Sequence, residues 1–136
     1  MRGFPRPVVT ADVAFLYEGF ARGELRIQAC DRCGQRRHPP APTCGSCRSS
    51  EWTAHVAGLR GRIHSYTVHH HPPIPPFETP HVVALVDMDD GFRFLAALRG
   101  VPVETVRIGL AVEACFEEIE PGYRLPVFRA VAGADA

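Results

Sequence analysis

Apolar residues recur at two different spacings along the chain, and the change between them divides it into parts. Over residues 10–23 they recur every three or four positions, which predicts an amphipathic helix. We expect Thr10 to cap the start of this helix and Gly23 to follow its end. Its apolar face contains Val13, Leu16, Tyr17 and Phe20. A single helix cannot bury such a face alone, so the face predicts docking onto the rest of the chain or onto a partner.

Beyond residue 23, several segments alternate apolar with polar residues at every second position, which is the period of a β-strand, and residues 81–88 are apolar on both faces. Two such segments, 24–29 and 51–56, flank a cysteine-rich loop, and Gln28 falls on the polar face of the first. Further strands are predicted at 61–70, 81–88, 92–99, 109–119 and 125–131. Five strands, with a connector at 102–108 before the fourth, are typical of a small closed barrel of the OB type.

The cysteines are the most specific chemical signal in the sequence. Cys30, Cys33, Cys44 and Cys47 form two CxxC knuckles with ten residues between them. Four thiolates fill the tetrahedral shell of one Zn²⁺ and leave no position open for a substrate, so we expect a structural zinc site. A pair of disulfides and a redox-active dithiol are the alternatives. His38, in the intervening loop, would become a ligand only if one cysteine were displaced.

Together these patterns predict a mainly β protein in three parts. We expect an N-terminal arm and helix at 1–23, a zinc ribbon at 24–57 and a five-stranded OB-fold barrel at 58–136. The start of the chain lacks the apolar segment of a secretory signal, and no run is long enough for a transmembrane helix. A cytoplasmic location without membrane contact is therefore the expectation, and an odd number of cysteines, five, fits a reducing compartment.

Several short runs, in order along nearly the whole chain, carry a resemblance. They are residues 25–34, 39–40, 44–47, 51–52, 61–68, 106–109 and 125–128. These runs resemble the zinc-ribbon and OB-fold family of acyl-CoA-associated proteins, which are accessory subunits of thiolase-like enzymes and aldolases. The resemblance implies an N-terminal helix, a rubredoxin-like zinc ribbon with the four cysteines as ligands, and a C-terminal OB barrel.

The resemblance also implies a function. It implies a non-catalytic accessory subunit that binds a thiolase-like or aldolase partner and helps hold or channel an acyl-CoA thioester in lipid or steroid metabolism. The implied assembly is a hetero-oligomer, with a heterotetramer built on a thiolase-type dimer as the family-based expectation. No catalytic residue carries over.

A single-stranded nucleic-acid-binding module is the alternative, because zinc ribbons and OB folds both bind single strands. Fifteen basic and fifteen acidic residues give a net charge of zero, which argues against it. The run Phe92-Arg93-Phe94 is the one interleaving of aromatic and basic residues in the predicted strands.

Candidate contacts with ligand and partner follow from side-chain chemistry. Arginines suit the phosphates of CoA, and the best-clustered candidates are Arg36, Arg37, Arg60 and Arg62, with ordinary surface charge as the alternative. The predicted partner-binding residues are Leu16, Tyr17 and Phe20 on the helix and Ile74 and Phe77 in the proline-rich segment 72–80. That segment would display its apolar side chains at low entropic cost, or serve as a passive linker.

Two further features remain open in the sequence. His69 and His71 would share one face of a strand and could bind a second metal, although a solvated strand end is the simpler interpretation. Cys115 could act as a nucleophile or be a passive thiol, and no histidine lies near it in the sequence.

Overall fold

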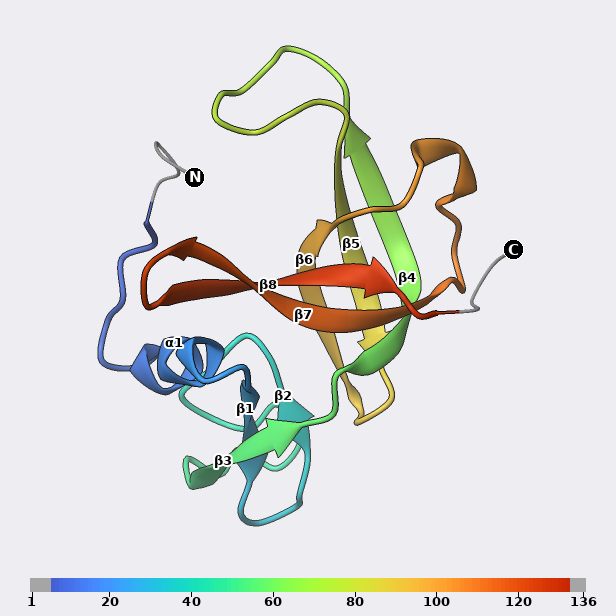
Figure 1. Ribbon diagram of the computed structural model, residues 1–136. Helices are drawn as coiled ribbons and strands as arrows, with labels where there is room; N and C mark the ends of the chain where they lie inside the picture. The colour runs from blue at the N-terminus through green and yellow to red at the C-terminus, as the bar shows by residue number, and fades with distance from the viewer. Residues whose placement is uncertain (1–5, 133–136) are drawn as a thin grey trace.

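The computed structural model describes residues 6–132, so the first five residues of the predicted arm and the last four of the predicted barrel domain lie outside the described part. The described chain forms a short helix, a small sheet and a closed barrel (Figure 1). The ribbon lies at one end of the barrel, and the helix lies beside both. The prediction of a mainly β fold with a five-stranded closed barrel is confirmed.

The small sheet has three antiparallel strands in the order β2-β1-β3. They are β1 (Leu25–Cys30), β2 (Arg36–Arg37) and β3 (Trp52–Ala57). β2 was not predicted, because two residues are too short to show a period. Gln28 was expected on the polar, outward face of the first strand, and this expectation is wrong, because its side chain is 3% exposed. Its buried Oε1 accepts a hydrogen bond from the Ala41 N–H of the intervening loop.

The barrel has the strand order β4-β5-β6-β8-β7, and β7 pairs with β4 to close it. Its strands are β4 (Arg60–His69), β5 (His81–Met88), β6 (Phe92–Leu98), β7 (Ala111–Glu120) and β8 (Tyr123–Ala130). Four of the five pairings are antiparallel, and β6 runs parallel to β8. The predicted helical turn of the connector is present as the 3₁₀ helix η1 (Val103–Thr105).

Apolar residues from all three parts form one core. Inward positions of the barrel strands supply most of it, and Phe128 is 0% exposed at its centre. Leu25 and Ile27 of β1 belong to the same cluster, so one apolar core extends from the barrel into the ribbon. Burial of this apolar surface is the main force that holds the barrel together.

The helix α1 (Ala14–Ala21) is shorter than predicted. The cap expected from Thr10 is wrong: the helix begins after Val13, without a side-chain cap, and the Thr10 hydroxyl donates to Asp12 instead. Gly23 follows the helix as predicted, at a φ of 74°, where a glycine avoids the strain of a Cβ. The buried side chains of α1 pack on the ring of Phe94 and its neighbours in the barrel.

Polar contacts fix the ribbon against the barrel. Asp90, in the turn between β5 and β6, forms an ion pair with Arg36 Nε at 3.2 Å and a hydrogen bond with His55 Nε2 at 2.8 Å. Its Oδ2 also accepts a hydrogen bond from the Gly58 N–H at 3.0 Å. The turn was predicted from Asp90-Gly91, but its role as the anchor of the ribbon was not, because its partners lie far away in the sequence.

Candidate metal centre and adjoining surfaces

The four predicted zinc ligands come together at the outer end of the small sheet. Their Sγ atoms all lie within 4.8 Å of one another, with 3.5 Å between Cys30 and Cys47 and 3.6 Å between Cys33 and Cys44. In a tetrahedral site with Zn–S bonds of about 2.3 Å, sulfur atoms lie roughly 3.8 Å apart. The four thiols therefore fit a zinc ion. All five cysteines of the chain are free, so the disulfide alternative is not realised.

The two knuckles share one backbone pattern. Gly34 N–H donates to the Cys30 carbonyl at 2.9 Å, and Arg48 N–H donates to the Cys44 carbonyl at the same distance. Gly34 and Arg48 both have a left-handed backbone, with φ of 78° and 66°. Arg48 is the one residue other than glycine with this conformation among residues 6–132, and it carries a strain that Gly34 avoids.

Backbone N–H groups prepare the thiols for a cation. Those of Cys47 and Ser46 lower the pKa of Cys44 to about 6, because they stabilise the thiolate. The backbone N–H of Cys33 likewise lowers the pKa of Cys30. Zinc binds thiolates rather than thiols, so these backbone groups favour the required form at Cys44 and Cys30. At Cys33 the backbone N–H of Gln35 acts in the same direction, but burial and the neighbouring thiols raise the pKa of that thiol to about 11.

His38 is not a ligand in this arrangement. Its ring stacks on Phe94 of β6, with centroids 4.3 Å apart and an interplanar angle of 23°. Burial lowers the pKa of His38 to about 4, so the ring is neutral near pH 7. Within residues 6–132, the cysteine centre is the one cluster of three or more potential metal ligands. β4 ends at His69, and His69 Nε2 bonds the Pro72 carbonyl at 2.7 Å, so His69 and His71 do not share the strand face expected for them. The second metal site considered there stays untested.

The predicted phosphate-binding arginines do not form one cluster, and each already has a contact within the chain. Arg36 pairs with Asp90, and Arg37 donates from Nη2 to the Ala41 carbonyl at 3.3 Å. On β4, Arg60 donates to Glu113 at 3.1 Å and Arg62 to the Gly109 carbonyl at 3.0 Å. Arg60 and Arg62 are exposed, whereas the two ribbon arginines are half-buried. Their role in CoA binding stays a prediction.

The predicted partner-binding residues of the helix line an apolar groove of about 520 Å³ between α1, the ribbon loop and β6. Leu16 and Phe20 are buried at its base, at 6% and 3% exposed, so the helix face packs on this chain first. Tyr17 is half-buried and Leu95 is 59% exposed. The groove has no charged side chain among its lining residues. Partner binding at the helix stays a prediction, and the groove is the surface on which it would act.

The proline-rich segment keeps one of its two predicted contacts on the surface. Ile74 is 50% exposed, whereas the Phe77 ring packs against His81 with centroids 5.2 Å apart. Cys115 is half-buried on β7, and its Sγ lies 3.8 Å from the Glu113 carbonyl oxygen. These positions leave the roles of Ile74, Phe77 and Cys115 as predictions.

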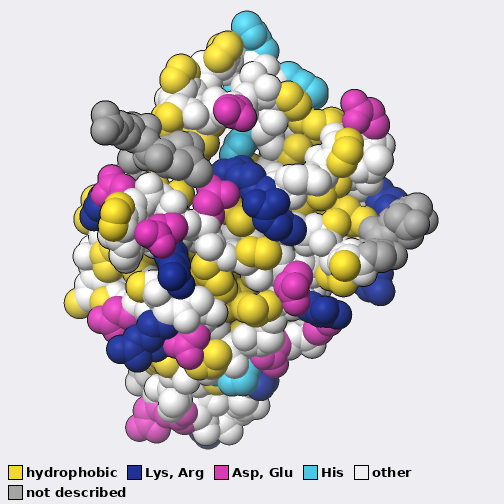
Figure 2. Space-filling view, viewed as in Figure 1, with side chains coloured by type: hydrophobic (Ala, Val, Ile, Leu, Met, Phe, Trp, Pro, Cys, Tyr) yellow, Lys and Arg dark blue, Asp and Glu magenta, His cyan; other side chains and the backbone are white. Residues whose placement is uncertain are grey.

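The visible surface carries mixed charge. Figure 2 shows acidic and basic side chains interspersed with apolar ones on this face, without a broad basic area. Seven arginines of the described chain form ion pairs with acidic side chains, such as Arg93 with Asp87 at 2.6 Å. No helix within residues 6–132 is long and apolar enough to cross a membrane.

Two family models match consecutive parts of the chain. The rubredoxin-like zinc ribbon domain of ChsH2 matches residues 18–53, and the C-terminal OB-fold domain of ChsH2 matches residues 54–117. The match of the zinc ribbon domain agrees with the geometry of the four cysteines, so the zinc cofactor predicted from the sequence is supported by both.

Named relatives and a solved structure extend these matches. The probable enoyl-CoA hydratase alpha subunit of Thermomonospora curvata is 42% identical over 92% of this chain, which spans 39% of that protein's length. A DUF35 domain-containing scaffold protein of Methanothermobacter thermautotrophicus is 30% identical over 72% of this chain and 75% of its own length.

A solved structure titled Ltp2-ChsH2(DUF35) aldolase is similar with a TM-score of 0.86 and 42% identity, over 92% of this chain and 98% of that one. Domain order, metal centre and barrel therefore agree between the family models and the structure described above. The chain belongs to the ChsH2/DUF35 family of zinc-ribbon and OB-fold proteins.

Proposed function

We propose that this chain is a non-catalytic accessory subunit that binds an aldolase or thiolase-like partner and helps hold an acyl-CoA thioester for it. The observation that carries the proposal is the similarity of this chain to a chain of the structure titled Ltp2-ChsH2(DUF35) aldolase. The similarity extends over 98% of the length of that other chain. The relative from Methanothermobacter thermautotrophicus is named a scaffold protein, which supports a role in assembly. The chemistry would reside in the partner, and the assembly would be a hetero-oligomer.

The apolar groove beside α1 is the proposed partner surface. It is lined by Tyr17, exposes Leu95 and carries no charge, so it suits an apolar segment of the partner. The thioester would be shared between the two proteins, and the exposed Arg60 and Arg62 are the accessible members of the predicted phosphate-binding set. The zinc centre would keep the ribbon side of the groove in place, because His38 packs into it from the loop between the knuckles.

The test is co-purification with a thiolase-like or aldolase protein of the same organism, followed by acyl-CoA turnover by the partner with and without this chain. We expect a stable complex and turnover that depends on this chain, with no turnover by this chain alone. Leu95→Arg should weaken the complex, whereas Val56→Arg, which changes a residue 54% exposed on the ribbon, should not. Turnover by the isolated zinc-loaded chain, or the absence of any complex, would contradict the proposal.

A further inference from the structure

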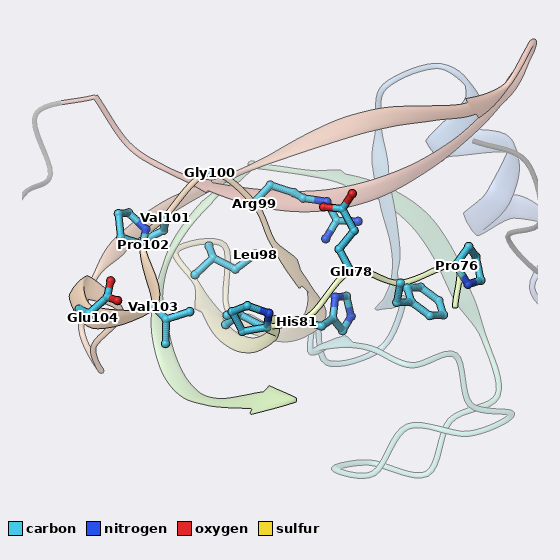
Figure 3. Close-up of a pocket in the computed structure, with 13 residues that line it drawn as sticks. Pro76, Glu78, His81, Leu98, Arg99, Gly100, Val101, Pro102, Val103 and Glu104 are labelled. Atoms are coloured by element: carbon cyan, nitrogen blue, oxygen red, sulfur yellow. The ribbon is translucent and has the colours of Figure 1, made fainter. Parts of the chain in front are cut away.

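A cavity of about 570 Å³ lies at the end of the barrel away from the ribbon, between the proline-rich segment and the connector that contains η1 (Figure 3). Its volume is within the range of small-molecule sites in proteins. It lies apart from the cysteine centre and shares no lining residue with the groove beside α1. A ligand in this cavity would therefore leave both of those sites open.

The base of the cavity is apolar. Val82 of β5 and Leu98 of β6 are paired across the two strands and are 5% and 6% exposed. Val101 and Val103 are half-buried on the side of the connector. Three prolines among the lining residues restrict the backbone, so a ligand that enters would order little of the protein. This base suits a chain of methylene groups, which gains free energy when it leaves water.

Each wall of the cavity carries one carboxylate. Glu78 lies in the proline-rich segment and Glu104 lies in η1, so the two come from separate loops. Both are exposed at the opening, and neither forms an ion pair within residues 6–132. Figure 3 shows the two side chains apart, with Leu98 and Val103 between them. Two uncompensated negative charges therefore lie on either side of an apolar base.

The remaining polar side chains of the wall add little positive charge. The Arg99 guanidinium faces Glu117, with N–O distances of 3.3 and 3.4 Å, so its charge is already compensated. Burial, the charge of Arg99 and that of His69 lower the pKa of His81, which leaves the imidazole neutral near pH 7. The two carboxylates at the opening therefore determine which charge a ligand can carry, and they repel anions.

A cation that fits this arrangement is organic rather than metallic. Glu78 and Glu104 do not belong to a cluster of potential metal ligands within the described residues. An ammonium group donates up to three hydrogen bonds and pairs with a single carboxylate. Two such groups joined by a methylene chain would match both the spaced charges and the apolar base.

We propose that this cavity binds an aliphatic diamine or polyamine. One ammonium group would pair with Glu78 and another with Glu104, while the methylene chain between them would lie over Val82, Leu98 and Val103. The cavity does not overlap the surface proposed for the partner, so this inference does not depend on the proposed function.

The experiment is an NMR titration of the zinc-loaded chain with 1,6-diaminohexane. Hexylamine and 1,6-hexanediol are the matched probes, because they keep the six-carbon chain and carry one charge and no charge. We expect millimolar diamine to shift the backbone amides of 77–82 and 98–104, and the diol to leave them unchanged. Hexylamine should bind about threefold more weakly than the diamine, which is the size expected for the loss of one exposed ion pair.

Variants separate the two parts of the site. The double change Glu78→Gln/Glu104→Gln should weaken diamine binding about tenfold, whereas Glu18→Gln/Glu51→Gln, the same charge change at exposed positions elsewhere, should leave it unchanged. Val101→Trp, which fills part of the cavity, should weaken the binding of diamine and hexylamine alike. Unchanged amides outside 77–82 and 98–104 show that each variant is folded.

Three results would overturn the inference. The first is a diamine response that is absent or confined to amides outside the cavity. The second is a response to 1,6-hexanediol as strong as the response to the diamine, because the charges would then play no part. The third is unchanged diamine affinity in Glu78→Gln/Glu104→Gln, because the cation would then be bound by other groups.

Discussion

The ribbon and the barrel are both small, mostly antiparallel β structures, yet different forces hold them. The barrel encloses an apolar core, with Phe128, Val86 and Val112 fully buried. The apolar residues of the ribbon, such as Leu25 and Ile27, belong to a cluster shared with the helix and barrel. At its outer end, the cysteines take the place of a core. Two structures of similar architecture can therefore depend on different parts of the sequence, one on an alternating pattern and the other on four positions.

The largest expected effect comes from removing one ligand. Cys44→Ser should abolish zinc binding, because Cys44 is 1% exposed and three thiolates leave the shell open. Zinc contributes on the order of 10 kcal/mol in isolated structural sites, so we expect residues 30–51 to unfold while the barrel stays folded. Zinc content per chain and the NMR amide spectrum measure the two parts separately. Cys115→Ser is the matched control, and loss of the barrel resonances together with the ribbon would contradict the expectation.

A change in the barrel core should produce the opposite result. Phe128→Ala should lower the free energy of unfolding by about 3–5 kcal/mol, because it leaves a cavity at a position 0% exposed. Urea unfolding followed by circular dichroism measures this loss.

Trp52 is the single tryptophan of the chain and pairs with Cys30 across β1 and β3, so its fluorescence in a chelator titration reports zinc binding at the cysteine centre. We expect the zinc affinity to be unchanged, and Leu95→Ala, at a site 59% exposed, to change stability by less than about 0.5 kcal/mol. A large loss of zinc affinity in Phe128→Ala would show that the cysteine centre of the ribbon depends on the apolar core of the barrel.

What could be predicted from the sequence follows the same division. Each barrel strand was located within a few residues, because most of them alternate in polarity and β5 is a short continuous apolar run. The four cysteines were identified by spacing alone, because knuckle geometry allows few separations. Both signals are local, so a single sequence carries them.

Contacts between the parts could not be predicted. Asp90 and His55 are 35 positions apart, and His38 and Phe94 are 56 apart, so no local pattern links them. The buried Gln28 depends on a loop that crosses it, and the helix start depends on packing rather than on a capping side chain. The cavity at the far end of the barrel escaped sequence reasoning for the same reason: its two walls are separate loops, and only the proline content of one was noticeable.

The smallest expected effect concerns the seam between the two parts, and it depends on pH. Burial holds the pKa of His38 at about 4, below its ordinary value of 6.5. The unfolded chain therefore binds more protons between these two values, so the free energy of unfolding is fully retained above pH 6.5 and falls as the pH drops toward 4. Allowing for the partial exposure of the ring, the loss between pH 7 and pH 5 should be about 1 kcal/mol.

His38→Phe isolates this contribution, because a phenyl ring can stack on Phe94 without titrating. In excess zinc, the variant should lose about 1 kcal/mol less than the unmodified chain between pH 7 and pH 5, as measured by urea unfolding. His70→Gln, which removes an exposed histidine, should follow the unmodified chain. If the His38→Phe curve runs parallel to that of the unmodified chain, the imidazole is not desolvated at the seam. The ribbon would then be fixed to the barrel by the Asp90 contacts and the shared apolar cluster rather than by a buried ring.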